Sequence, residues 1–267
     1  MSYSDSSPPP VNGLLGFLAR NDRAYVTGAC ESIDLIYGQE VCGSGDRIRH
    51  VYFPTDSFIS MIAPAGASEN LEVGMVGSEG MFGITVLLDV KTSALAGLVQ
   101  GSGPALRMSA ARFGKIASER ASFRRILNRY LYVLTAQLAQ TAACNRFHHL
   151  DARLARWLLM THDRAHGQTF HLTHKFLAYM LGVRRAGVTE AAGRLQIHGL
   201  IQYAHGELTI LNRPALEGAS CACYTVDQAT YLQHLGTSRN MPLLFNVSAK
   251  GPMVCCAALR YGPMIRC

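Results

Sequence analysis

The pattern of apolar and polar residues changes character along the chain. From about residue 29 to residue 108, short runs rich in β-branched and aromatic residues alternate with turn sequences such as Gly43-Ser44-Gly45 and Pro64-Ala65-Gly66. Short strands separated by such turns, roughly every 8 to 12 residues, are typical of an antiparallel sandwich or barrel. We therefore predict a small jelly-roll after a short apolar helix at residues 14–19. Its strands are expected at residues 33–36, 49–53, 58–62, 71–76, 94–99 and 105–108.

A helical period replaces the strand pattern between residues 109 and 147. Ser109 can cap a short helix, and a long helix is predicted over residues 122–147. In it Phe123, Leu127, Tyr130 and Leu134 recur at intervals of four and three residues, which places them on one face. That face is wide enough to pack on the roll and on a second copy of the helix, so we predict a homodimer. A helix that covers only its own domain would show the same pattern.

A second helical region begins with a helix over residues 151–160. Leu154, Trp157 and Leu158 are expected to point inward, and Arg153 and Arg156 outward. The next segment, residues 172–201, begins with a helix that Thr173 can cap. Gly182 ends it, because glycine accepts the left-handed backbone of a sharp turn between helices.

The helix after this turn has the features of a recognition helix. It is predicted to run from about Arg184 to Gly199, with an inward stripe of Val188, Ala191 or Ala192, and Leu195. A helix that presents cations and short polar groups at its N-terminal end is suited to enter the major groove of DNA. The outward residues are Arg184, Arg185, Thr189, Glu190 and Arg194.

A hairpin follows the recognition helix. Strands are predicted at residues 200–203 and 207–211, joined by a tight connection through His205 and Gly206. A helix-turn-helix followed by a hairpin is a winged helix, and His205 at its tip is a further candidate DNA contact. Asn212 can cap the last helix, with Pro214 in its first turn.

These elements predict an α+β chain, divided as follows: a disordered N-terminus at 1–12, the roll at 13–121, the long helix at 122–147, the winged helix-turn-helix at 148–225, and a C-terminal tail without predicted structure at 226–267.

Composition adds little to this interpretation. The 267 residues carry a net charge of +7. The predicted DNA-binding segment, residues 151–235, holds 8 Lys and Arg against 6 Asp and Glu, so charge alone would not indicate DNA binding. No run approaches the roughly 18 to 20 apolar residues of a membrane helix. The N-terminal sequence has no basic or apolar leader region, so we expect a cytoplasmic protein without a membrane partner.

The order of roll, long helix and winged helix-turn-helix resembles the Crp/Fnr family of bacterial transcription regulators. The most specific similarity covers residues 172–211, including Thr173, Gly182, Arg185 and the Gly199-Leu200-Ile201 sequence; weaker similarity extends it over about residues 14–225. The resemblance implies a roll that senses a signal, a long helix that pairs two subunits, and paired winged helices that bind a two-fold symmetric site in duplex DNA. It also suggests RNA polymerase as a partner.

The resemblance assigns roles to single residues. Thr173 is at a position that contacts phosphate, and Arg185 at one where an arginine reads guanine through O6 and N7. Ala186 replaces the glutamate common in cyclic-AMP-responsive members, and Glu190 replaces an arginine; Glu190 could accept from cytosine N4, so the base preference should differ. Arg184 and Arg185 could also be a solvated pair that contacts only phosphate.

The sensory end departs further from the family. Cyclic-nucleotide binders hold the ligand with a Gly-Glu pair and with an arginine that forms charge-assisted hydrogen bonds to the buried phosphate. Here Ile84 follows Gly83, and no arginine occurs between Phe82 and Leu106. Lys91, Thr92 and Ser93 occupy the neighbourhood of the expected ligand pocket. We predict that cyclic AMP does not bind tightly and that the signal, if the roll senses one, is different.

The sequence predicts no metal, cofactor or catalytic site. His162 and His166 could share a helical face, but no carboxylate or cysteine pattern completes a metal site with them. The eight cysteines match no zinc or disulfide framework, and Cys221 and Cys223 would point about 200° apart on one helix. No phosphate loop or nucleophile motif is present. The main alternative to a DNA-reading regulator is a protein-interaction regulator with a degenerate roll and weak, phosphate-driven DNA binding.

Overall fold

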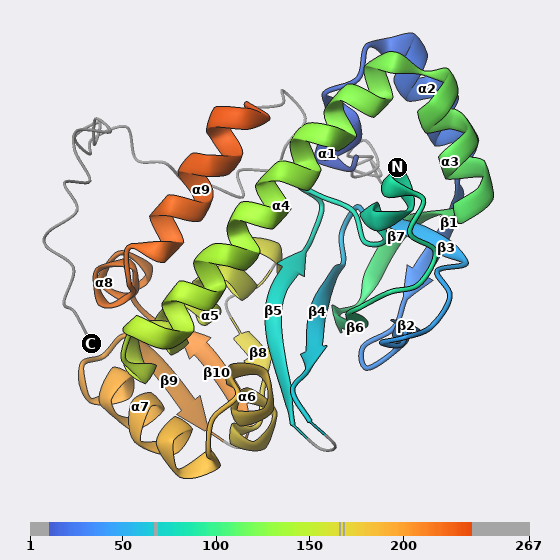
Figure 1. Cartoon of the computed structure of the whole chain (residues 1–267). Coiled ribbons are helices and arrows are strands. Elements are labelled where there is room, and N and C mark those ends of the chain that lie inside the picture. The colour runs from blue at the N-terminus through green and yellow to red at the C-terminus, as the bar shows by residue number, and fades with distance from the viewer. Residues whose placement is uncertain (1–10, 67–68, 166, 168, 205, 237–267) are drawn as a thin grey trace, which may run out of the picture.

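The computed structural model describes residues 11–66, 69–165, 167, 169–204 and 206–236 (Figure 1). The β-rich roll lies at one end and a compact helical domain with a small sheet at the other, and the long helix α4 (Ala121–Phe147) runs between them (Figure 1). Among the described helices, none is long and apolar enough to cross a lipid bilayer.

The roll consists of two antiparallel sheets. One has the strand order β1 (Glu31–Leu35), β7 (Gly103–Ser109), β3 (His50–Pro54); the other has the order β2 (Glu40–Cys42), β6 (Ala96–Gly101), β4 (Phe58–Pro64), β5 (Asn70–Val76). Their inward residues, among them Phe53, Ile59 and Val99, are fully buried in one core. All six predicted strands are present. The seventh, β2, has only three residues, none of them buried, and so lacks the apolar run that would predict a strand.

The N-terminal helices cover one end of the roll. The apolar helix predicted at residues 14–19 is α1 (Gly13–Gly16), which ends early and is followed by α2 (Arg20–Gly28). The prediction of disorder through residue 12 is wrong at its end, because Asn12 is buried and its amide donates to the carbonyls of Pro54 and Gly80 at 2.8 Å each. Residues 1–10 lie outside the described part of the chain.

Two helices follow the last strand of the roll. Ser109 caps α3 (Ala110–Glu119) as predicted, its hydroxyl accepting from the amide of Arg112 at 3.3 Å. In α4 the predicted face of Phe123, Leu127, Tyr130 and Leu134 is buried within this single chain, in the core of the roll. This face is therefore not available to a second copy of the protein.

The C-terminal domain has its own core. It contains α5 (Leu150–Arg164), α6 (His174–Leu181), α7 (Arg185–Ile197) and α8 (Arg213–Ala219). A three-stranded sheet with the order β8 (Thr169–His171), β10 (Glu207–Ile210), β9 (Ile201–Ala204) completes it. The hairpin of β9 and β10 is the predicted wing; β8, three residues long, was not predicted. Asn212 caps α8 as expected, accepting from the amide of Ala215 at 3.0 Å.

A further helix, α9 (Cys223–His234), lies alongside α4 (Figure 1). Its Tyr231 is buried, and the Tyr231 hydroxyl donates to the carbonyl of Glu79 in the roll at 2.8 Å. The rings of His234 and Tyr132 on α4 lie 4.6 Å apart. The predicted domain boundary at residue 225 thus falls inside a helix that connects the C-terminal domain to the roll. Of the predicted tail, residues 237–267 lie outside the described chain.

The position of α9 overturns one prediction on α5. Arg156 was expected to face solvent, but it is 6% exposed, and its Nη2 lies 2.6 Å from Oδ2 of Asp227 on α9. The helical period of α5 alone could not show that another helix covers this side.

Candidate nucleic-acid interface

The two helices of the helix-turn-helix meet as the sequence predicts. The Thr173 hydroxyl caps α6 by accepting from the amide of Phe176 at 3.1 Å. Gly182 ends α6 in the left-handed region with φ of 62°. The inward stripe of α7 is confirmed: Val188, Ala191, Ala192 and Leu195 are at most 4% exposed. Two of the four are alanines, and such small side chains allow the two helices to approach closely.

This packing leaves the N-terminal end of α7 in solvent. Arg184 is the N-cap residue, and Arg184, Arg185, Thr189 and Glu190 are all exposed. Thr173 is exposed beside them at the start of α6. A helix N-terminus carries a partial positive charge, so the end of α7 that holds the two arginines favours an anionic surface. Five of the predicted DNA contacts therefore gather at one exposed end of the motif.

His174 and Tyr203, which no sequence pattern placed at this interface, position the N-terminal end of α7. The Thr189 hydroxyl lies 2.9 Å from Nδ1 of His174, and the His174 ring stacks on Tyr203 of the wing with centroids 4.5 Å apart. The Tyr203 hydroxyl donates to the carbonyl of Leu172 at 2.5 Å. Partial burial, and then the nearby Arg185 cation, lower the pKa of His174. The wing is thereby connected to both helices. No local sequence signal could have shown this connection, because His174, Thr189 and Tyr203 are far apart along the chain.

Two other predicted DNA contacts, Arg194 and His205, do not join this exposed group in the described structure. Arg194 forms a two-point ion pair with Asp151 at the start of α5, with Nε–Oδ2 and Nη2–Oδ1 distances of 2.7 Å each. This ion pair connects α7 to α5, and it lowers the pKa of Asp151. His205 lies outside the described residues.

The comparisons with known proteins agree with this geometry. A protein-family model described as a Crp-like helix-turn-helix domain matches residues 152–219. The chain carries a Crp-like helix-turn-helix domain. The search of curated proteins found no match.

Solved structures extend the likeness to the roll. CLP, the c-di-GMP responsive global regulator of Xanthomonas campestris, matches with a TM-score of 0.60 and 16% identity, over 73% of this chain and 100% of its own. TTHB099, a CRP-family transcriptional regulator from Thermus thermophilus, matches with a TM-score of 0.58 and 17% identity, over 70% and 96%. FixK2 from Bradyrhizobium japonicum matches with a TM-score of 0.56 and 15% identity, over 72% and 98%. The resemblance to Crp/Fnr regulators is therefore confirmed as a fold: a roll, a long helix and a Crp-like domain.

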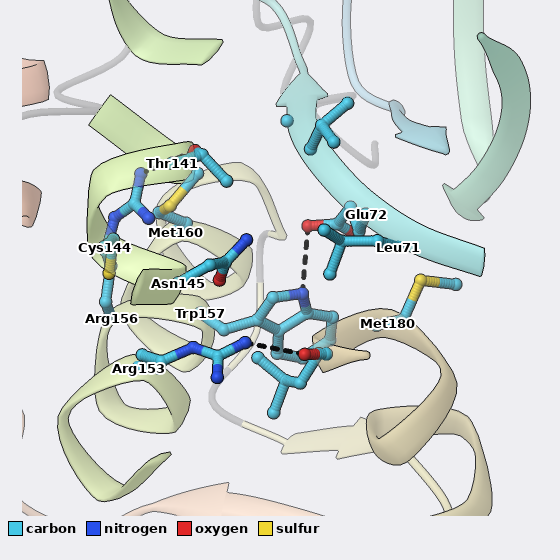
Figure 2. Close-up of a pocket in the computed structure, with 13 residues that line it drawn as sticks. Leu71, Glu72, Thr141, Cys144, Asn145, Arg153, Arg156, Trp157, Met160 and Met180 are labelled. Atoms are coloured by element: carbon cyan, nitrogen blue, oxygen red, sulfur yellow. Dashed lines mark hydrogen bonds between the residues drawn. The ribbon is translucent and has the colours of Figure 1, made fainter. Parts of the chain in front are cut away.

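A buried carboxylate connects the roll to the Crp-like domain. Glu72 on β5 is 7% exposed and accepts from Trp157 Nε1 of α5 at 3.0 Å (Figure 2). It also accepts from the Ser60 hydroxyl at 2.6 Å and from Gln100 Nε2 at 3.0 Å. Burial raises the pKa of Glu72 to about 7, although all three donors act in the opposite direction. Figure 2 places this contact in a pocket between β5, α4, α5 and α6.

The predicted ligand pocket does not form a comparable site. Gly83 has φ of 89° and precedes a short 3-10 helix, η1 (Ile84–Leu88), and the Ile84 side chain is buried in the core of the roll. Lys91 is exposed and pairs with Asp89 at 3.4 Å, and the Ser93 hydroxyl donates to the carbonyl of Leu95 at 2.6 Å. Thr92 forms a backbone bridge with Arg47. None of the five predicted residues lines the pocket of Figure 2.

Four side chains that lie far apart in the sequence, apart from the Cys221 and Cys223 pair, converge near the end of α4. The ligand atoms of Cys144, His148, Cys221 and Cys223 all lie within 4.8 Å of one another. The other candidate pair from the sequence is His162 and His166. His162 accepts from Arg213 Nη1 at 2.5 Å, and His166 lies outside the described residues.

Proposed function

We propose that this protein is a transcription regulator that binds duplex DNA as a homodimer through its Crp-like domain. The observation that carries the proposal is the exposed N-terminal end of α7, where Arg184, Arg185 and Thr189 stand beside Thr173 at the start of α6. Cations at a helix N-terminus fit the phosphates and base edges of a major groove. The match of residues 152–219 to a Crp-like helix-turn-helix domain supports the same interpretation.

We assign distinct roles to the residues at this end. The guanidinium of Arg185 can donate twice to O6 and N7 of one guanine. Thr173 and Arg184 contact phosphate, which sets the register of α7 on the duplex. Glu190, exposed one turn into α7, accepts from cytosine N4. Arg194 is engaged by Asp151, so we assign it a base contact only if that ion pair opens.

The homodimer places two such helices on one site. Since the apolar side of α4 is buried in the roll, the proposed contact uses its exposed side, where Asn128, Thr135, Ala139 and Ala142 follow one another at helical spacing. Paired recognition helices must match half-sites about 34 Å apart. A signal would act by changing the packing of the roll or of α4, and thereby the spacing of the two α7 helices; RNA polymerase remains the further partner expected of such a regulator.

We propose that the signal is not cyclic AMP. The residues expected to cradle its phosphate include no arginine, and one of them, Ile84, is turned into the core. A buried phosphate without charge-assisted donors is poorly stabilised. Calorimetric titration should give no saturable binding; saturation at submicromolar concentration would contradict this part of the proposal.

Selection of bound sequences from a random duplex pool tests the DNA-binding function. The wild-type protein should enrich a two-fold symmetric consensus. Arg185→Ala should lose one guanine preference in each half-site and weaken binding by roughly 1 to 3 kcal/mol per lost contact. Arg112→Ala, which removes an exposed arginine on α3 far from the Crp-like domain, is the charge-matched control and should keep the full consensus.

The opposite outcome would favour the protein-interaction regulator. Recovery of no consensus, together with steep salt dependence on any duplex, would show that the cations of α7 contact only phosphate. An unchanged consensus with Arg185→Ala would remove the base contact assigned to that residue.

A further inference from the structure

We propose that Cys144, His148, Cys221 and Cys223 form a metal site that binds one Zn²⁺ ion. The four residues come from three segments: the last turn of α4, the residue that follows α4, and the connection from α8 into α9. The Cys144 and Cys221 sulfurs are 3.4 Å apart, and the Cys223 sulfur is 3.4 Å from Nδ1 of His148. All four ligand atoms lie within 4.8 Å of one another.

The local backbone explains why the thiols converge. On one continuous helix, Cys221 and Cys223 would point about 200° apart. The structure instead ends α8 at Ala219 and starts α9 at Cys223, so the chain turns between the two sulfurs. His148 likewise leaves the helical conformation directly after α4, with φ of −109° and ψ of 142°. The expectation from the sequence that the two thiols diverge is therefore wrong.

The ligand set matches zinc in chemistry and in spacing. Three thiolates and one imidazole are a common structural zinc set, with Zn–S distances of about 2.3 Å and Zn–N distances of about 2.0–2.1 Å. Tetrahedral geometry then places the ligand atoms about 3.5–3.8 Å from one another. The spacing here is close to that range, so adjustments of about an ångström would complete the tetrahedron. Cysteine sulfur favours zinc over the hard cations magnesium and calcium.

Two arginines of α5 compensate the charge of such a site. Zn²⁺ with three thiolates and a neutral imidazole carries one net negative charge. Arg153 and Arg156 of α5 lie beside the thiols, and among the described residues the Nε atoms of both are buried without a hydrogen-bond partner. Figure 2 shows Cys144 and Arg156 close together, on the far side of the pocket from Glu72. Unpaired N–H groups close to thiolate sulfurs can serve as the outer-shell hydrogen-bond donors that metal sites use.

Zinc binding requires the three thiols to lose their protons, because the thiolate is the metal ligand. Metal binding would release these protons to solvent. Because Cys144 and His148 lie at the end of α4 and Cys221 and Cys223 at the start of α9, the ion would fasten these two helix ends together, next to the Arg156–Asp227 ion pair.

Metal analysis of the full-length chain, purified under reducing conditions from zinc-supplemented cells, tests the proposal. Mass-spectrometric elemental analysis should find about one zinc ion per chain. Cys221→Ser and Cys223→Ser should each lower this content at least several-fold. The matched control replaces Cys255, Cys256 and Cys267 by serine in one chain, and Cys42→Ser is a second control; both should retain the zinc.

A measurement on the unmodified chain covers the possibility that a cysteine variant does not fold. Cobalt added to the demetallated wild-type protein should produce the intense visible absorption of tetrahedral Co²⁺ and the ultraviolet band of thiolate-to-metal charge transfer. The proposal is overturned if cobalt gives only the weak spectrum of octahedral coordination. It is also overturned if zinc is lost in the control instead of in Cys221→Ser, or if the chain isolates without zinc and with Cys144 and Cys221 joined as a disulfide.

Discussion

Gly182 shows how one residue positions the recognition helix. Its φ of +62° permits the turn between α6 and α7, and a Cβ atom there would lie 2.9 Å from Cδ1 of Leu71 on β5. The turn thus requires glycine for its backbone and for its close approach to the roll. Gly182→Ala should lower the free energy of unfolding by about 1–2 kcal/mol.

Gly193 provides the matched control for that prediction. It lies within α7, and a Cβ atom there would meet nothing within 4 Å. Gly193→Ala should therefore raise stability by about 0.5–1 kcal/mol, because alanine loses less backbone entropy in a helix. Urea unfolding of both variants checks the pair; equal effects of the two substitutions would contradict the role assigned to Gly182.

The buried Glu72 carboxyl between β5 and α5 makes the stability of the folded chain depend on pH. Burial raises the pKa of Glu72 from 4.5 to about 7. The folded state therefore binds the proton more tightly than the unfolded state. The stabilisation that comes from the protonated Glu72 is complete below pH 4.5 and is lost as the pH rises to about 7. The loss over that window is about 3 kcal/mol.

Glu72→Gln should remove this pH dependence at the junction of the two elements. Urea midpoints measured at several values between pH 4.5 and pH 8 should decline less steeply for the variant than for the wild type. Glu69→Gln, an exposed carboxyl next to β5, is the control and should follow the wild-type curve. Parallel curves for Glu72→Gln and the wild type would show that Glu72 does not titrate in this window.

At the scale of the whole molecule, the three sides of α4 have different surroundings. One side is buried in the roll, a second is covered by α9, and the third remains exposed. The proposed dimer uses the exposed side, whose small residues allow two helices to approach closely. The same arrangement explains why the most apolar face of α4 is not the one available to a second copy.

Ala139→Arg tests the dimer. A large charged side chain at the centre of the exposed side should weaken dimerisation by at least about tenfold, or about 1.4 kcal/mol. Sedimentation velocity over a concentration series measures the dissociation constant. Ala24→Arg on the exposed surface of α2 adds the same charge elsewhere and should leave it unchanged. A dimer of wild-type strength in Ala139→Arg would place the interface on another surface.

The sequence was most informative where a short-range pattern decides the structure. The strand pattern predicted six of the seven strands of the roll, and the helical period predicted α4 and α7 nearly to their ends. Capping by Ser109, Thr173 and Asn212 was predicted because a cap connects residues only three positions apart. For the candidate site, the exposed end of α7 followed from the same period, whereas the contact of His174 with Tyr203 did not.

What the sequence determined by itself was the set of elements and the faces they bury, because periodicity, caps and turn glycines act within a few residues. The tertiary structure alone decided which surfaces meet. It buried Arg156 under α9, engaged Arg194 with Asp151 and used the apolar face of α4 within one chain. It also brought Cys144 to within 3.4 Å of Cys221, 77 positions away. Such contacts depend on the packing of whole helices, which no local pattern of residues encodes.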